Sequence, residues 1–263
     1  MSLQPAESRL VVPFAGSVSG QGPLTWGEKA LLQDQRETGW ALNATGAQNL
    51  APGTTVEQAA GRLGRLISNQ PALRVRLADD EHGDPYQTVA ASGEVAVEVL
   101  DFADDDDPVD VAKYTERLWQ DWLIDPIDHY RDWPSRMGIV RHRGQALYQV
   151  LSFNHLVIDG ASMTYLMPEL GVGKPPARSG RSTPMNILEL ADYEHSEAPR
   201  RSAGGLCGSG SRNCATSRRP PSANRCMPVA GWAAGTGTAG SPRRLPSRRC
   251  WPSRSAPAGT SPG

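Results

Sequence analysis

Cysteine is absent before Cys207, so the larger part of the chain offers no thiol for a disulfide or a metal site. Long hydrophobic runs are missing too, since no apolar stretch approaches the ~18 residues that cross a membrane. The N-terminus lacks the basic segment followed by an apolar stretch that marks a signal peptide. These absences predict no membrane partner and leave a cytoplasmic location as the default expectation.

The last 60 residues lack most of the residue types that build a folded core. From Gly204 to Gly263 there is no Asp, Glu, Lys, Ile, Phe or Tyr, and Gly, Ser, Arg, Pro and Ala supply 44 of the 60 residues. Residues 1–197 hold all 28 carboxylates against 16 Lys and Arg, a net charge of −12, whereas the whole chain has a charge of −1. The acidic part argues against nucleic acid as a partner.

Three interpretations of this basic tail compete. A segment rich in Pro, Ser and Gly is typical of a disordered nucleic-acid-binding arm. A metal or disulfide module is disfavoured because the cysteine spacings of 7, 12 and 24 contain no C-x-x-C pair. The third interpretation is out-of-frame translation of GC-rich DNA: from Gly205, a shifted frame with suitable codons spells Ala-Leu-Arg-Phe-Trp-Glu, a helical pattern. We predict that residues 204–263 form a disordered, out-of-frame tail.

The remaining residues show the patterns of an α/β fold. Thr25-Trp-Gly-Glu28 is a capping box, and Thr55 opens a second helix with one apolar face. An acidic run before Pro108 is interpreted as a solvated loop at a helix start, so no metal site is expected. The patterns predict helices near 25–36, 55–69 and 108–123, packed on one mixed sheet that contains strands 73–77, 95–99, 136–142 and 146–153.

One motif stands at a predicted strand-to-helix junction. It is His155-Leu-Val-Ile-Asp159-Gly160, an H-x-x-x-D-G sequence that follows an apolar strand and precedes a helical run. Such junctions border clefts in layered folds, which makes His155 the candidate functional histidine. The other four histidines lie in loop-like or charged sequence and are predicted at the surface: His82, His129, His142 and His195.

The order of four segments resembles a known family. These segments are 23–32, 70–76, 134–140 and 154–160. Together they look like the N-terminal lobe of a condensation domain of nonribosomal peptide synthetases, in the chloramphenicol-acetyltransferase-like superfamily of acyltransferases. The resemblance implies an N-terminal extension over 1–20 and a chloramphenicol-acetyltransferase-like lobe over 21–203. The family's C-terminal lobe has no counterpart in this sequence, which predicts a truncated or frameshifted domain.

The resemblance implies acyl transfer from a thioester to an amine or hydroxyl. The attacking group must lose a proton, and an imidazole can accept it at neutral pH, so His155 is the expected catalytic base. The family carries two adjacent histidines, and Asn154 stands in place of the first one. No bound cofactor is expected, because a carrier-protein phosphopantetheine or CoA thioester is the substrate. The implied partners are an acyl or peptidyl carrier protein and a small amine or alcohol.

The same resemblance implies structural roles around the base. Asp159 is expected to pair with an arginine behind the loop, with Arg74 as the first choice and Arg136 as the rival, because a buried lone carboxylate is costly. Gly160 is expected to let the backbone turn tightly, or simply to begin a helix. Asn154 is expected to support the motif.

Three functions remain open on the sequence alone. The first is a condensation-type acyltransferase in nonribosomal peptide or related secondary-metabolite synthesis, impaired by loss of the second lobe. The second is a non-catalytic remnant or a module that docks a carrier protein. The third is an acidic domain with a nucleic-acid-binding tail.

Overall fold

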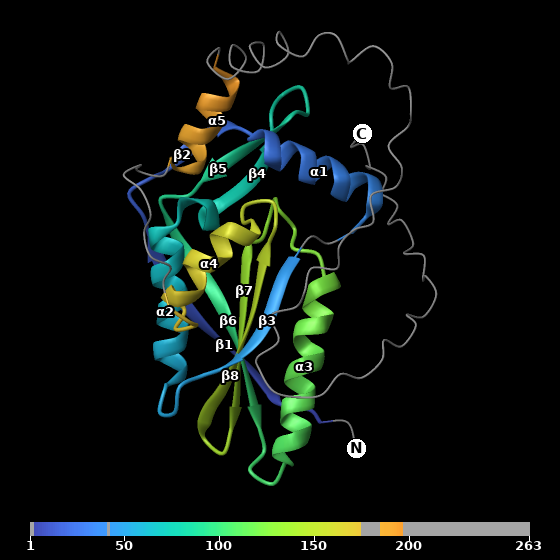
Figure 1. Ribbon diagram of the computed structural model, residues 1–263, viewed down its shortest axis with the longest axis vertical. Coiled ribbons are helices and arrows are strands. Elements are labelled where there is room, and N and C mark those ends of the chain that lie inside the picture. The colour runs from blue at the N-terminus through green and yellow to red at the C-terminus, as the bar shows by residue number, and fades with distance from the viewer. Residues whose placement is uncertain (1–2, 41–42, 175–184, 197–263) are drawn as a thin grey trace, which may run out of the picture. The chain divides into compact units, whose positions relative to one another are not determined.

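The computed structural model describes residues 3–40, 43–174 and 185–196. The predicted tail over 204–263, with its four cysteines, lies outside these residues. The described part is a mixed α/β arrangement of two sheets with helices packed on them (Figure 1). The predicted fold class, a mixed sheet with helices packed on it, is confirmed.

The larger sheet has five strands in the order β1-β6-β7-β8-β3. β6 and β7 run parallel, whereas the other three neighbouring pairs are antiparallel. The strands are β1 (Ala6–Ala15), β3 (Asn43–Asn49), β6 (Ser92–Phe102), β7 (Ser135–His142) and β8 (Gln145–Asn154). A tight hairpin joins β7 to β8 through Arg143 and Gly144, which both have positive φ.

Ala6–Ala15, within the predicted N-terminal extension, forms an edge strand of the larger sheet. β1 pairs with β6 over ten residues, from Ala6 opposite Asp101 to Ala15 opposite Ser92. Its side chains also pack against α2 (Val56–Asn69). Gly64 of this helix allows the close contact, because a Cβ atom there would lie only 2.5 Å from the Val12 side chain. The segment was missed because its alternation of apolar and polar residues is irregular and includes Pro13.

Two helices cover opposite faces of this sheet, as Figure 1 shows for α2 and α3 (Pro108–Ile124). Met137 and Ile139 of β7 belong to a core cluster with α2, α4 (Gly160–Glu169) and the apolar side of β6 and β8. Val140, on the alternate face, packs in a separate cluster with α3. Gly138 lets α3 approach closely, because a Cβ there would lie 3.1 Å from the Trp122 ring.

The smaller sheet corrects the predicted sheet membership. It has the order β2-β5-β4 and consists of β2 (Gly20–Pro23), β4 (Val75–Asp79) and β5 (Pro85–Val89). The predicted strand 73–77 therefore belongs here, and its first residues form a short 3-10 helix, Pro71–Arg74. Alternation within one strand does not determine which strand it pairs with, which is why the sequence placed it in the larger sheet.

Two more helices accompany the small sheet. α1 (Trp26–Thr38) begins at the predicted capping box, in which Thr25 and Glu28 exchange hydrogen bonds, and ends at Gly39 in the left-handed conformation. α5 (Ile187–His195) lies against β2, with Leu188 close to Gly20 and Gly22. Glu194 of α5 accepts a hydrogen bond from the Trp26 backbone N–H, at 2.6 Å. The helices predicted at 25–36, 55–69 and 108–123 are thus all present.

Glu28 is the most unusual charged group in this region. Its residue is only 2% exposed, and Oε1 has no hydrogen-bond partner among the described residues. Burial is the main reason that the pKa of its carboxyl is raised to about 7. The hydrogen bonds from Thr25 lower this pKa, and the negative charge of Glu194 raises it. Leu32, on the same side of α1, packs with Leu24, Leu77 and Leu156.

Candidate functional site

The motif begins where β8 leaves the large sheet. The last six residues of β8 are buried, and its final residue, Asn154, donates its backbone N–H to the Pro134 carbonyl at 3.0 Å. β8 lies between β7 and β3, so its end is held by a strand on each side. The residue that follows, His155, is therefore presented from a fixed point at the end of the sheet.

Asn154 ties the turn to two neighbouring elements. Its Oδ1 accepts the Leu156 backbone N–H at 2.8 Å, and its Nδ2 donates to Asn43 Oδ1 at 3.3 Å. Asn43 in turn donates to the Trp122 and Asp125 carbonyls at 2.9 and 2.7 Å, at the end of α3. A buried amide chain of this kind restricts the turn, since each lost partner would leave a buried polar group unpaired.

His155 is half-buried, and one of its ring nitrogens is committed to the loop itself. Nδ1 lies 2.8 Å from the Ile158 carbonyl oxygen. A carbonyl only accepts, so Nδ1 must carry the hydrogen, and Nε2 of the neutral ring keeps its lone pair. Leu156 and Ile158 are 6% and 3% exposed, and they anchor the loop in the small-sheet and large-sheet clusters respectively.

Asp159 is exposed and caps α4, which corrects the expected arginine pair. Its Oδ1 accepts the Ser162 backbone N–H at 2.7 Å, and this bond holds the pKa of Asp159 below its ordinary value. Among the described residues no arginine pairs with it. Arg136, the rival partner, instead pairs with Asp125 and lies over the Trp122 ring. The carboxylate needs no arginine because a helix N-terminus already stabilises it.

Arg74, the expected partner of Asp159, is buried and donates to carbonyl groups instead. Nε donates to Ile67 O at 3.1 Å, and one terminal nitrogen donates to Val18 O at 2.8 Å and Ala90 O at 2.6 Å. The guanidinium fills the space beside Gly16, where a Cβ atom would lie 2.2 Å from it. Burial lowers the pKa of Arg74 below its ordinary value. Arg74 therefore joins α2, the β1–β2 connection and the end of β5.

Gly160 is the first residue of α4 and is not among the described glycines with positive φ. Gly160 therefore needs no left-handed conformation, and the helix-start interpretation holds. Within the part of the chain that the structure describes, a Cβ atom built on Gly160 would meet no heavy atom within 4 Å. These residues leave the space beside the start of α4 open.

Two of the four other histidines are not at the surface. His129 is 9% exposed, with Nε2 2.6 Å from Gln35 Oε1, and burial lowers its pKa. His142 is 3% exposed, and its Nε2 lacks a partner among the described residues. Loop-like sequence around each of them gave no sign that neighbouring elements would cover them. His82 is exposed beside Glu81, and His195 lies 3.0 Å from the Leu24 carbonyl.

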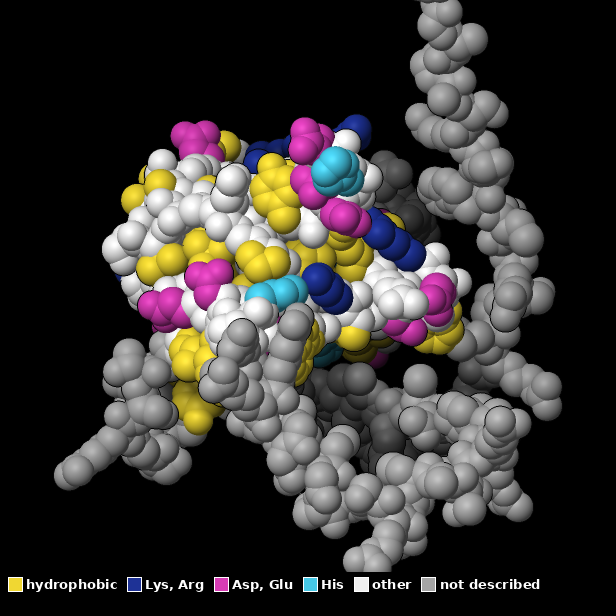
Figure 2. Space-filling view, turned by 90° about the horizontal axis from the view of Figure 1, so that it is seen from above, with side chains coloured by type: hydrophobic (Ala, Val, Ile, Leu, Met, Phe, Trp, Pro, Cys, Tyr) yellow, Lys and Arg dark blue, Asp and Glu magenta, His cyan; other side chains and the backbone are white. Residues whose placement is uncertain are grey.

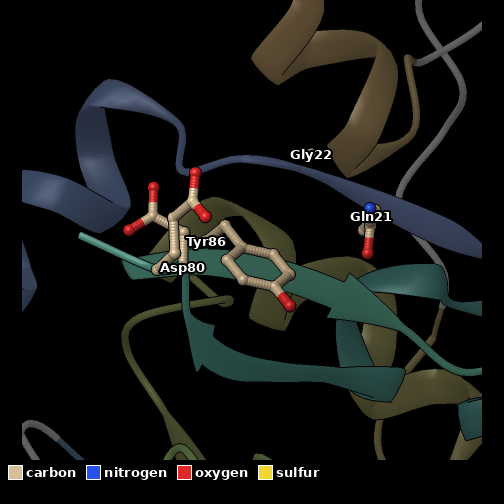
Figure 3. A pocket seen from close by; sticks show the side chains of 5 residues that line it. Gln21, Gly22, Asp80 and Tyr86 are labelled. Carbon is tan, nitrogen blue, oxygen red and sulfur yellow. The ribbon is translucent and has the colours of Figure 1, made fainter. Parts of the chain in front are cut away.

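An open pocket of about 620 Å³ lies on the small sheet and contains none of the motif residues. Its lining residues are Gln21, Gly22, Asp80, Glu81 and Tyr86. Figure 3 shows the Tyr86 hydroxyl pointing away from the Asp80 carboxylate, so the two do not converge on one point. Figure 2 shows this end of the molecule, where acidic side chains gather beside hydrophobic ones.

The described residues hold no group of three or more His, Cys, Asp or Glu placed to bind a metal ion. None of the described helices combines the length and hydrophobicity that a transmembrane span requires.

Comparison with known proteins gives one family. The sequence matches the family described as "Condensation domain" over residues 33–201. Among solved structures, the first condensation domain of the CDA synthetase is 18% identical, with a TM-score of 0.52, over 75% of this chain and 50% of that one. The SgcC5 protein from Streptomyces globisporus is 22% identical, with a TM-score of 0.53, over 70% and 44%.

A third structure, a variant of the starter condensation domain of the rhizomide synthetase, is 15% identical, with a TM-score of 0.56, over 78% of this chain and 50% of that one. At these identities the structures show a shared fold. The chain spans about half the length of the solved structures it matches. No curated protein gave a significant match.

Proposed function

The chain belongs to the condensation domain family, and we propose that it supplies the base-bearing half of an acyltransferase. In this proposal a thioester-bound acyl group is joined to an amine or hydroxyl, in nonribosomal peptide or related secondary-metabolite synthesis. The acyl donor is carried by the phosphopantetheine of a carrier protein or by CoA, and the acceptor is a small amine or alcohol.

The observation that carries the proposal is the hydrogen bond from His155 Nδ1 to the Ile158 carbonyl, at 2.8 Å. It leaves the Nε2 lone pair available from an anchored loop. In the reaction the acceptor nitrogen or oxygen bonds to the thioester carbon, and the carbon–sulfur bond breaks. His155 takes the proton that the acceptor loses and returns it to the leaving thiolate. No serine or cysteine nucleophile is needed, because the acyl group passes directly between the two substrates.

The surroundings of His155 suit a place where substrates meet. Gly160 borders open space, and Asp159 is satisfied by the helix it caps, so neither competes with a substrate for the imidazole. Orientation of both substrates requires walls on two sides, and proximity contributes as much to catalysis as the base does. Because the chain spans half of its structural relatives, we expect the second wall to come from a second half.

The test joins residues 1–196 to the second half of the first condensation domain of the CDA synthetase. An acyl-pantetheine thioester and a small amine are supplied, and the amide is measured by mass spectrometry. We expect His155→Ala to lower the rate by about 10²–10⁴-fold, the usual contribution of a general base. His82→Ala is the matched control, because it removes an exposed imidazole. A folded chimera whose rate does not depend on His155 would contradict the proposal.

The second candidate is a non-catalytic module that docks a carrier protein, and the half-length coverage favours it. The 263-residue chain itself separates the two candidates. A docking module binds an acyl carrier protein with the same affinity whether or not His155 is present, and it shows no transfer in either the chain or the chimera.

A further inference from the structure

Arg76 of β4 lies over an immobilised tryptophan. Its guanidinium carbon is 3.5 Å from the Trp133 ring centroid. The ring is held by a hydrogen bond from Nε1 to the Glu94 carbonyl, at 2.8 Å, and by edge-to-face packing on Phe14, at 5.0 Å. A Cβ atom on Gly93 would lie 3.0 Å from the ring, so the tryptophan fits closely. The stacked guanidinium is therefore pre-oriented, so less side-chain conformational entropy would be lost when a ligand binds.

The polar groups of Arg76 find no partner in the described part of the chain. Among the described residues its guanidinium makes no hydrogen bond or ion pair, and its buried Nε has no partner. Burial lowers the pKa of Arg76, and the negative charge of Asp132 raises it. Arg76 and Asp132 are not in ion-pair contact. Arg74, two residues earlier, donates instead to three carbonyl groups. A buried donor without a partner is costly, and a planar guanidinium matches the oxygens of a carboxylate or phosphate.

The site lies at the same end of the sheet as the motif. β7 and β8 pair with Ser135 opposite Phe153, and the Pro134 carbonyl accepts the Asn154 N–H beyond this pair. Trp133 directly precedes Pro134, and His155 directly follows Asn154, so both flank this hydrogen bond. Leu77, next to Arg76, packs in the same cluster as Leu156, next to His155.

We propose that Arg76, stacked on Trp133, is an anion-binding subsite for a substrate that reacts at His155. This rests on the proposed function for its role, although binding itself does not require turnover. The ligand group is an oxyanion, and it has two possible sources: the phosphate of the phosphopantetheine arm, or a carboxylate on the acyl group or acceptor. The planar fork would bind two of its oxygens, with Trp133 fixing the plane of the fork.

The test is calorimetric titration of the 263-residue chain with 4′-phosphopantetheine, pantetheine and succinate. We expect at least one of the two anions to bind more tightly than pantetheine, and Arg76→Gln to weaken that binding by about tenfold or more. Arg76→Lys should give an intermediate loss, because it keeps the charge without the fork. Arg131→Gln is the matched control, since Arg131 is two residues from Trp133 in the sequence and its side chain is 86% exposed.

The outcomes distinguish a phosphate from a carboxylate ligand, and they test the subsite separately from the catalytic role of His155. Arg76-dependent binding of 4′-phosphopantetheine assigns the subsite to the phosphate, and Arg76-dependent binding of succinate assigns it to a carboxylate. The subsite is overturned if neither anion binds better than pantetheine, or if Arg131→Gln weakens binding as much as a folded Arg76→Gln does. Because calorimetry needs no acyl transfer, the result does not depend on whether His155 acts as a base.

Discussion

The two sheets differ in how they are held together, and the motif loop depends on both. The five-stranded sheet is covered by helices on each face, and its main cluster contains 18 buried hydrophobic residues. The three-stranded sheet packs through four buried leucines, Leu24, Leu32, Leu77 and Leu156, and through polar contacts. Ile158 enters the first cluster and Leu156 the second. The position of His155 is thus set where a large hydrophobic cluster meets a small one.

Truncation of one buried side chain in each cluster should show most strongly how differently the two sheets are stabilised. Phe153→Ala is expected to lower the free energy of unfolding by about 3–5 kcal/mol, because it opens a cavity in the larger cluster. Leu77→Ala should cost about 2–3 kcal/mol, since its cluster is small and can relax. Urea unfolding followed by circular dichroism measures both, and a larger loss for Leu77→Ala would reverse the comparison.

Arg74 is the main polar link between the two regions. Arg74→Met should cost about 2–4 kcal/mol, because it leaves the Ile67, Val18 and Ala90 carbonyls without their donor. Hydrogen exchange should show faster opening at β5 than at β7 in this variant. Equal protection at both strands, with unchanged stability, would show that Arg74 does not join them.

Glu28 should make the small-sheet side sensitive to pH. Its pKa is about 7 in the folded protein against an ordinary value of 4.5, so the folded state resists ionisation. The loss of folding stability caused by this buried carboxyl is absent below about pH 4.5, grows between pH 4.5 and 7, and is complete above about pH 7. Glu28→Gln should therefore be more stable than the parent by about 1–3 kcal/mol at pH 8, with the difference vanishing near pH 4. Thermal melts across this range provide the check, and a difference independent of pH would refute it.

Asp159 should have the smallest effect on stability. Asp159→Ala removes a helix cap and is expected to cost about 1 kcal/mol, far less than breaking a buried ion pair. Because its folded pKa is lowered, this contribution is present above the ordinary pKa and is lost as the pH falls through the folded value. Asp159→Asn should retain most of the stability at neutral pH. A loss of several kcal/mol for Asp159→Ala would restore the buried-pair interpretation.

The sequence predicted the elements that carry their own signals. A capping box located α1, one apolar face located α2, alternation located β6, and strand-like runs located β7 and β8. β3, with the sequence Asn-Ala-Thr-Gly-Ala-Gln-Asn, has few residues that favour strands, and it forms only because β8 offers it a free edge. Pairing partners are a property of the assembled chain, so the second sheet could not be read from any one segment.

The candidate site shows the same limit. The H-x-x-x-D-G motif and its junction were predictable from residue order, and the structure places His155 there. The Arg74 partnership was wrong because Asp159 is satisfied three residues away, at the Ser162 N–H, a capping arrangement that the sequence already contained. Arg76 was passed over because its importance arises from the Trp133 ring, 57 positions later in the chain.

The tautomer of His155 decides whether its Nε2 can serve as the base. Long-range ¹H–¹⁵N correlation spectra at pH 8, with the resonance assigned by loss in His155→Gln, report which ring nitrogen carries the hydrogen. We expect a protonated Nδ1 bound to the Ile158 carbonyl and an Nε2 with a free lone pair. A hydrogen on Nε2, with Nδ1 unprotonated, would leave no base facing the substrate and would contradict the role proposed for His155.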